Sequence, residues 1–421
     1  MSYLAVNGGT PVVDIEKAKF EWPRITDESE KAVVKQLHTS ISIYDNSGII
    51  GEFEKIFADY HNRKLGLLSN SGTSAIFSMF EGIGLMPGDE VICPVYTFHA
   101  SVSPLINTGA IPIFADSDEF GNISIDSIKT KLTPRTKAVV VTHMWGTPTK
   151  DINKIQIFCR DHNLFLLEDC SHAHGSSIYT KKVGSFGDAA AWSLQGQKTI
   201  TGGEGGIMLT DNTKIFNRAL LQGHYNKRPK NEISSSETEY KFFLTGMGLK
   251  LRAHPLAIAL ALQQFNHLDT FISQRQKYAN IFTKAFNDYP FFTTPETISK
   301  DIQSSWYAYI LLFNENESFG VSREEFVSAL HAEGLIEVDI PGSTGLLNEL
   351  PLFTKTNEIM PRLYNKPIYS QGPYPIADKF YNSVIKLPVW TFEDEYKIVD
   401  SYISGIQKVA DHLMEHKSLA E

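Results

Sequence analysis

The chain has 421 residues, 42% of them hydrophobic and 21% charged, so it is long enough to bury a large core. Its net charge of −9 includes no strongly basic block, which argues against nucleic acid and anionic membrane surfaces as partners. The cysteines lack a C-x-x-C spacing, no apolar run approaches about 18 residues, and the N-terminus has no signal-like apolar stretch. We therefore predict a cytoplasmic protein without disulfides, a zinc cluster or a membrane span.

The first part of the chain predicts an extended lead-in followed by two helices. Residues 7–22 are expected to be extended, and a helix is predicted from residue 26 to residue 37. Glycine and serine in residues 41–51 predict a mobile loop, after which a second helix is expected over residues 52–60.

From residue 65 onward, short apolar runs alternate with helix-length segments. The predicted strands are 65–69, 90–93, 111–114, 138–142 and 164–167, and the predicted helices are 74–85, 98–107 and 152–162. This alternation indicates an α/β fold with a mostly parallel sheet that is covered by helices on both faces. Ligands of such sheets bind outside the carboxyl ends of the strands, so residues that follow a strand are the candidate site.

The second half of the chain predicts two bodies joined by a helix. Further strands are expected at 189–194, 207–209 and 306–313, and helices at 212–221, 253–265, 268–286, 322–333 and 393–416. A polar loop is predicted over 226–239, and its basic run 227–230 is interpreted as a solvated face or, alternatively, as a substrate entry. We predict that residues 1–288 form a large α/β domain and residues 289–421 a smaller α+β domain, whose segment 339–353 helps to line the substrate pocket.

Lys198 lies in a glycine-rich loop between two short apolar runs. The glycines let the backbone pass close to a bulky group, and an ammonium group beside buried strands costs free energy unless it has a task. A desolvated lysine near other charges can attack a carbonyl and form a Schiff base. The alternative is a solvated turn lysine, which is the commoner case for a lysine in general.

Two more motifs follow predicted strands. Ser71, Gly72 and Thr73 precede a helix N-terminus, where free N–H groups and the helix dipole attract an anion such as phosphate. Ordinary N-capping is the alternative there. Tyr96 and Phe98 come after the next strand and offer an aromatic face on which a planar cofactor could stack, or they are core residues.

Acidic and histidine residues follow the strand at 164–167. The carboxylate of Asp169 can pair with the ring nitrogen of a pyridine cofactor and keep it protonated, or it can cap the next turn. His172 and His174 form an H-x-H pair, but no third ligand stands at a useful spacing, so we predict no metal site.

These motifs together resemble a known family. The pattern S-x-x-x-x-K-x-x-x-x-G-E-G-G, from Ser193 through Lys198 to Gly206, resembles the cofactor-lysine segment of the DegT/DnrJ/StrS family. Its members are fold-type I aminotransferases that depend on pyridoxal 5′-phosphate (PLP) and act on keto-sugars and keto-cyclitols. The resemblance covers nearly the whole chain, with five motifs in the family's order.

The resemblance implies roles for individual residues. The backbone around Gly72 and Thr73, with the hydroxyl of Ser193, would hold the PLP phosphate. Phe98 would stack on the cofactor ring, and Asp169 would pair with its pyridinium nitrogen.

Two positions carry the chemistry or depart from the family's pattern. Lys198 would hold PLP as a Schiff base and move the proton as general base and acid. His172 replaces the usual glutamine near the cofactor's phenolic oxygen, which is similar to the family branch that acts on inosose-type cyclitols.

The segment 245–252 resembles the family's G-Y-N-Y-R-L element, which reaches the partner subunit's active site. Gly248 stands where the family has asparagine, and Lys250 stands where it has arginine. We predict a homodimer in which Lys250 contacts the partner's PLP phosphate in place of the missing amide. The alternative is that Lys250 is a surface residue and that water or Arg252 fills the gap.

The implied reaction moves an amino group from an amino-acid donor, glutamate or glutamine, to a keto-sugar or keto-cyclitol. Two alternatives belong to other classes. Some relatives are dehydratases in which histidine replaces the lysine, and Lys198 argues against that reaction. A non-catalytic PLP-fold binding or regulatory protein would not need Lys198, Asp169 and Ser193 together.

Overall fold

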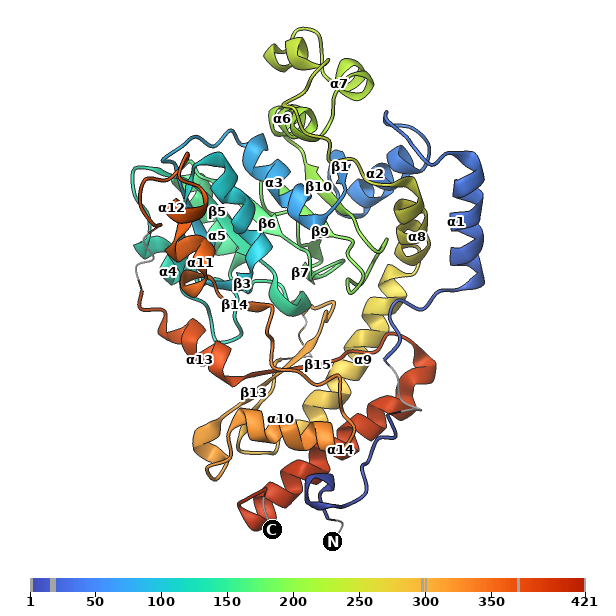
Figure 1. Ribbon diagram of the computed structural model, residues 1–421, viewed down its shortest axis with the longest axis vertical. Helices are drawn as coiled ribbons and strands as arrows, with labels where there is room; N and C mark the ends of the chain where they lie inside the picture. Colours follow the sequence, from blue (N-terminus) through green and yellow to red (C-terminus); the bar gives the residue numbers. More distant parts are fainter. Residues whose placement is uncertain (1–2, 16–19, 297–298, 300, 369–371, 420–421) are drawn as a thin grey trace.

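The larger part of the molecule is built around a seven-stranded sheet with the order β1-β10-β9-β6-β5-β2-β4 (Figure 1). The computed structural model describes residues 3–15, 20–296, 299, 301–368 and 372–419, so parts of the predicted lead-in and of the predicted small domain lie outside it. The strands are β1 (Leu65–Ser69), β2 (Glu90–Pro94), β4 (Ile111–Ala115), β5 (Thr136–Thr142), β6 (Phe165–Asp169), β9 (Ala189–Ser193) and β10 (Gly206–Thr210). The run from β4 to β9 is parallel, whereas β10 pairs antiparallel with β9 and β1. The predicted α/β class with a mostly parallel sheet is confirmed.

Helices cover both faces of this sheet because both faces of its strands are apolar. On β9, Ala191 packs in the cluster of α3 and α6, whereas Trp192 packs in the opposite cluster of α2 and α8. The helices of this part are α1 (Asp27–Thr39), α2 (Gly48–Tyr60), α3 (Gly72–Gly82), α4 (Ile125–Thr130), α5 (Ile152–Asp161), α6 (Thr213–Gly223), α7 (Lys227–Glu232) and α8 (Pro255–Phe265). Because successive strand residues point to opposite faces, both layers bury apolar surface.

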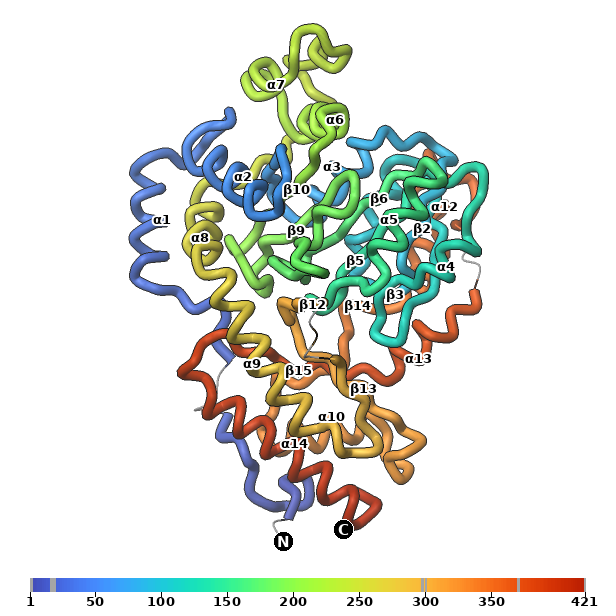
Figure 2. The backbone as a smooth tube through the Cα atoms, turned by 180° about the vertical axis from the view of Figure 1, so that it is seen from behind, coloured from blue at the N-terminus to red at the C-terminus, as the bar shows by residue number. Residues whose placement is uncertain are grey.

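A smaller body lies below the sheet in Figures 1 and 2, and α9 (Leu268–Phe286) runs down into it. Its three-stranded sheet consists of β11 (Phe292–Thr293), β13 (Tyr309–Phe313) and β15 (Val384–Leu387). The helices α10 (Arg323–Ala332) and α14 (Tyr396–His416) share its apolar cluster with α9. The predicted capping box of α10 is present, since Ser322 and Glu325 bond each other's backbone. The domain boundary at residue 288 stays a prediction.

The remaining elements are short and connect the two bodies or their edges. The strands are β3 (Tyr96–Phe98), β7 (Ser177–Ile178), β8 (Lys181–Lys182), β12 (Ile302–Gln303) and β14 (Thr344–Leu346), and the helices are α11 (Pro351–Thr354), α12 (Thr356–Ile359) and α13 (Pro375–Ser383). Short 3-10 helices lie at Ala5–Asn7, His99–Ser101, Ser103–Thr108, Met144–Gly146, Thr238–Phe242, Glu315–Glu317, Leu347–Glu349 and Glu393–Glu395. No helix in the described ranges is long and apolar enough to cross a membrane. The cytoplasmic location stays a prediction.

One predicted element is wrong in type, and several differ in extent from the structure. The helix expected over 98–107 is absent: Phe98 ends the strand β3, and two short 3-10 helices follow. Pro104 stands near the start of the second and lacks the N–H that a longer α-helix would use. The helix expected from residue 52 begins at Gly48, so the predicted loop before it is shorter.

The solvated-face interpretation of residues 227–230 is wrong for Arg228. Its side chain is 1% exposed, and its guanidinium donates to both carboxylate oxygens of Glu54 and to Glu232. The polar loop expected here instead contains α7, which projects from the sheet at the top of Figure 1. A buried guanidinium needs such paired carboxylates, and here they fasten the base of the projection onto α2.

Candidate active site

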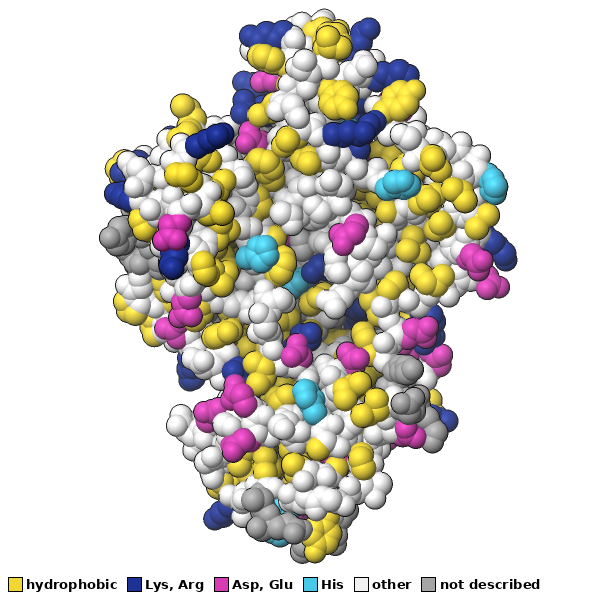
Figure 3. Space-filling view, viewed as in Figure 1, with side chains coloured by type: hydrophobic (Ala, Val, Ile, Leu, Met, Phe, Trp, Pro, Cys, Tyr) yellow, Lys and Arg dark blue, Asp and Glu magenta, His cyan; other side chains and the backbone are white. Residues whose placement is uncertain are grey.

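A cavity of about 350 Å³ opens where the parallel strands end, between the large sheet and the smaller body. Figure 3 shows this face of the molecule hollowed near its middle. The predicted site residues that line the cavity are Gly72, Thr73, Phe98, Asp169, His172, Ser193 and Lys198. Strand order explains this convergence, since the carboxyl ends of β5, β6 and β9 meet at one edge of the sheet.

Lys198 reaches into the cavity from a tight turn after β9. Its N–H donates to the carbonyl oxygen of Gln195, and its Nζ lies 4.6 Å from the ring centre of Tyr307. Burial lowers the pKa of the Lys198 ammonium to about 8, while the Asp169 carboxylate acts in the opposite direction. A lysine with this pKa has a substantial neutral, nucleophilic fraction near neutral pH.

We expect the reaction of Lys198 with PLP to speed up as pH rises through about 8. Below that pH most Lys198 is a non-nucleophilic ammonium, and above it most is free amine. The measurement is the initial rate of covalent uptake of PLP by cofactor-free protein across this range, with the rate of Lys198→Ala subtracted. A rate that keeps rising to about pH 10.5, where an ordinary lysine titrates, would contradict the lowered pKa.

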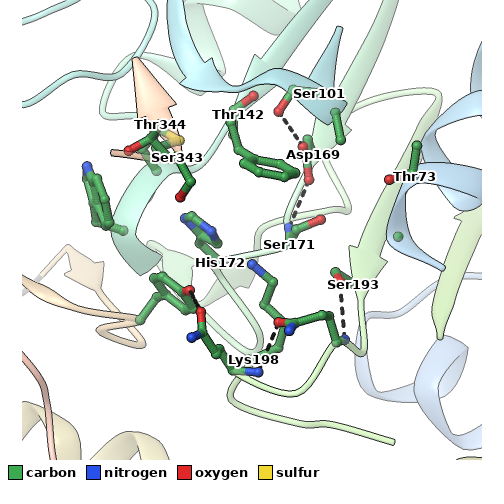
Figure 4. Close-up of a pocket in the computed structure, with 18 of the residues that line it drawn as sticks. Thr73, Ser101, Thr142, Asp169, Ser171, His172, Ser193, Lys198, Ser343 and Thr344 are labelled. Carbon is green, nitrogen blue, oxygen red and sulfur yellow. Dashed lines mark hydrogen bonds between the residues drawn. The ribbon is translucent and has the colours of Figure 1, made fainter. Parts of the chain in front are cut away.

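Asp169 ends β6 and points into the same cavity as Lys198 and His172 (Figure 4). Its Oδ2 accepts a hydrogen bond from Ser101 Oγ at 2.6 Å, and its Oδ1 accepts one from the N–H of Ser171 at 3.0 Å. These two donors fix the carboxylate and suit a charged acceptor. Asp169 therefore presents an oriented acceptor to a cationic partner in the cavity.

The neighbouring Glu168 points to the other side of β6 and is structural. Its carboxylate accepts hydrogen bonds from the N–H groups of Gly184 and Phe186 and lies 3.1 Å from His143 Nε2. His143, Glu168 and Cys170 are close enough to hold a metal ion. However, His143 Nδ1 already accepts from a backbone N–H, so His143 and Glu168 already use their polar atoms to anchor the strand end.

The start of α3 forms a tight cradle against the end of β9. A Cβ placed on Gly72 would lie 2.6 Å from Ser193 Cβ, so only glycine fits there. The packing brings the first N–H groups of α3 and the hydroxyl of Ser193 to one side of the cavity, beside Thr73. Backbone donors at a helix N-terminus together with a hydroxyl group suit a phosphate.

We expect Gly72→Ala to weaken PLP retention by about tenfold. The added methyl group must displace the backbone or Ser193, and such overpacking costs about 1–3 kcal/mol. Equilibrium dialysis of PLP measures the effect. Gly196→Ala is the matched control in the nearby loop, because its Cβ would meet nothing closer than 3.9 Å. Equal retention by both variants would contradict the cradle.

His172 stacks face to face on Tyr307, with ring centres 3.9 Å apart and planes 3° from parallel. Among the described residues its Nδ1 has no hydrogen-bond partner. Burial, followed by the positive charge of Lys198, lowers the pKa of His172 well below its usual range. His172 therefore presents a neutral imidazole with an open ring nitrogen, which can hydrogen-bond a ligand.

The aromatic candidates separate in the structure. Tyr96 is fully buried and packs edge-on against Phe380, so its interpretation as a core residue holds. Phe98 is 37% exposed and lines the cavity, so it is available to a planar ligand. Its stacking role stays a prediction.

Sequence reasoning missed several residues that line the cavity. Trp145 follows β5, and the centres of the Trp145 and His172 rings lie 5.8 Å apart. Tyr307 and Lys386 come from the smaller body and line the same cavity. Trp145 could have been found, because it follows a predicted parallel strand as the other site residues do. Of the predicted segment 339–353, only its first part lines the cavity.

Lys250 is the predicted site residue that the structure does not bring to the cavity. It is exposed, and it does not line the cavity of its own chain. The next residue is close to the cradle, since the carbonyl oxygen of Leu251 accepts from the N–H of Asn70. The role of Lys250 across a subunit interface stays a prediction.

Comparison with known proteins adds a family match, two relatives and one solved structure. The model described as the DegT/DnrJ/EryC1/StrS aminotransferase family matches residues 24–400. A GDP-perosamine synthase of Escherichia coli O157:H7 is 31% identical over 87% of this chain and 91% of its own. A putative L-glutamine:3-amino-2,3-dideoxy-scyllo-inosose aminotransferase of Micromonospora echinospora is 30% identical over 97% of both chains. The aminotransferase structure from Psychrobacter cryohalolentis covers 94% of this chain and 99% of its own with a TM-score of 0.83 at 24% identity, which bears on the fold.

Proposed function

The chain belongs to the DegT/DnrJ/EryC1/StrS aminotransferase family of PLP-dependent, fold-type I enzymes, and from this premise we propose that it aminates a keto-sugar or keto-cyclitol with glutamate or glutamine as donor. The observation that carries the proposal is the placement of Lys198 and Asp169 in one cavity beside the anion cradle. Each of these three features supports a separate task in transamination, namely proton transfer, activation of the cofactor ring and retention of its phosphate.

The cavity fits PLP. The helix start at Gly72 and Thr73, with Ser193, would hold the phosphate. Asp169, with its carboxylate oriented by two donors, would hold the protonated ring nitrogen. Phe98 would pack on the ring. PLP, when bound, supplies an electron sink for the negative charge that develops on the donor's α-carbon.

Lys198 performs the proton transfer in this proposal. Its Nζ, once free, takes the proton from the α-carbon of the donor and later returns a proton to the carbon that becomes the amine-bearing centre of the acceptor. A pKa of about 8 suits both directions near neutral pH. The neutral ring of His172 would donate a hydrogen bond to the cofactor's phenolic oxygen. His172 would thereby take over the role of the family's glutamine at this position.

A screen of ketones tests the proposal. Purified protein with PLP is incubated with L-glutamate or L-glutamine carrying ¹⁵N in the α-amino group, together with inososes or nucleotide-linked keto-sugars. We expect ¹⁵N to appear in one acceptor class, and Lys198→Ala to give none. A product that has lost oxygen without gaining nitrogen would instead support the dehydratase alternative. If no ketone reacts and the donor leaves the protein's absorbance unchanged, the result would instead support the alternative of a non-catalytic binding protein.

We also propose that the protein is a homodimer in which Lys250 acts on the partner's PLP phosphate. The exposed projection near Lys250 carries large apolar side chains, among them Phe242, Leu244 and Met247, which suit contact with a second copy. Gly248 offers no side-chain amide, and lysine binds phosphate well as a point charge.

We expect Lys250→Ala to weaken PLP retention by about tenfold, the cost of losing one charged hydrogen bond, without separating the dimer. Mixing Lys250→Ala with Lys198→Ala should restore activity, because a mixed dimer has one site with Lys198 from one chain and Lys250 from the other. Subunit exchange is verified with differently tagged chains. Activity no higher than that of the separate variants, despite exchange, would place Lys250 outside the partner's site.

A further inference from the structure

An ion pair on the cavity wall has no role in the chemistry above. Lys386 Nζ lies 3.6 Å from Asp339 Oδ2, and both residues line the cavity. Their backbones face each other as a β-bridge, in which each N–H donates to the other's carbonyl oxygen, at 2.9 and 2.7 Å. The two side chains are therefore held side by side by the backbone rather than by their own attraction.

The segment that carries Asp339 is also attached to the opposite wall. It continues into β14, where Thr344 is paired with Phe98 of β3. One side of the Lys386–Asp339 pair is thus anchored to the strand that presents Phe98, and the other to β15 of the smaller body. This arrangement keeps the Lys386 ammonium at the cavity rather than in bulk solvent, although its side chain is 30% exposed.

Lys386 is a positive charge of the cavity to which the chemistry above assigns no task. Among the lining residues that the structure describes, the cations are Lys198 and Lys386. In the proposed function, Lys198 holds the cofactor and transfers the proton. The pair with Asp339 is long and partly exposed, and partly exposed ion pairs contribute little to stability, so another anion can compete for Lys386.

We infer that Lys386 binds an anionic group of a substrate in the cavity, and that Asp339 competes for the same ammonium. The inference rests on the proposed function, because every amino-acid donor brings an α-carboxylate. A phosphate of a nucleotide-linked acceptor has the same chemistry and is the second possible source. Binding by Lys386 would orient the substrate relative to Lys198, which lines the same cavity.

Calorimetric titration of the PLP-loaded protein tests this without turnover. The donor probes are L-2-methylglutamate and L-2-methylglutamine, which keep the α-carboxylate but have no α-proton to lose, and the phosphate probes are GDP and dTDP. We expect Lys386→Met to weaken one probe class about tenfold and Lys386→Arg to retain most of the affinity. Asp339→Asn should tighten the same class several-fold, because it removes the competing carboxylate. General damage to the cavity wall would not weaken probe binding in the Lys386 variant and tighten it in the Asp339 variant.

The outcomes distinguish the donor carboxylate from an acceptor phosphate, and they test the inference separately from the proposed function. A change confined to the methylated amino acids assigns the donor carboxylate, and a change confined to GDP or dTDP assigns an acceptor phosphate. 4-Aminobutyramide, which is glutamine without the α-carboxylate, should bind the wild type and Lys386→Met equally. Unchanged affinity of Lys386→Met for both classes, or no binding of either class by the wild type, overturns the inference. Amination by the wild type in the ketone screen tests the proposed function separately.

Discussion

Lys198→Ala will abolish turnover, with a loss of about 10⁴-fold or more in the rate of the donor half-reaction. Proton transfer by a positioned side chain contributes about 10²–10⁴-fold, and this variant also loses the covalent attachment of the cofactor. Lys198 Nζ lies 4.6 Å from the ring centre of Tyr307 in the described cavity, and the lowered pKa of Lys198 suits the task. Single-turnover spectroscopy with L-glutamate or L-glutamine measures the rate.

The fold should survive this change, because alanine removes an ammonium group from a partly buried position. Thermal unfolding with and without PLP checks this. Lys181→Ala is the matched control, since Lys181 lies exposed on β8, away from the cavity. A Lys198→Ala protein that is folded, loaded with PLP and still turns over at an appreciable fraction of the control's rate would mean that another base moves the proton.

Asp169→Asn should lower the rate of the donor half-reaction by about 100-fold, the usual cost of removing a major electrostatic contributor. Asparagine keeps the shape, so an oxygen can still accept from Ser101 or Ser171, but asparagine lacks the negative charge that would hold the ring nitrogen protonated in the proposed function. Rates measured at saturating PLP separate this effect from weaker cofactor binding. Ser101→Ala should have a smaller effect, because it leaves the charge in place. Near-normal rates for Asp169→Asn would show that a different group performs this task.

The candidate site could be predicted from sequence wherever one of its residues follows a strand of the large sheet. Asp169 ends β6, Ser193 ends β9 and Gly72 begins the helix after β1, and the strands themselves are short apolar runs that the sequence displays openly. Their convergence follows from strand polarity alone, because the carboxyl ends of parallel strands meet at one edge. Family resemblance then supplied the roles, which geometry alone does not.

Residues that depend on distant contacts could not be predicted. Tyr307 reaches Lys198 only because the smaller body folds against the sheet, and Arg228 is buried by Glu54, which lies 174 positions away in the chain. Local composition predicts neither contact, and a basic run such as 227–230 indicates solvent exposure when read locally. The helix predicted to begin at Phe98 is wrong at its first residue for a similar reason, since pairing with the remote β14 makes Phe98 the last residue of the strand β3.

The central claim, that Lys198 bears the cofactor, is tested most directly by reducing the PLP-loaded wild-type protein with borohydride and locating the modified lysine by peptide mass spectrometry. Reduction makes the attachment permanent, so the readout does not depend on turnover or on knowing the substrate. The account predicts a single phosphopyridoxyl group on the peptide that contains Lys198. A phosphopyridoxyl group on another lysine, such as Lys250 or Lys386, or its absence from Lys198 in fully loaded protein, would contradict the account.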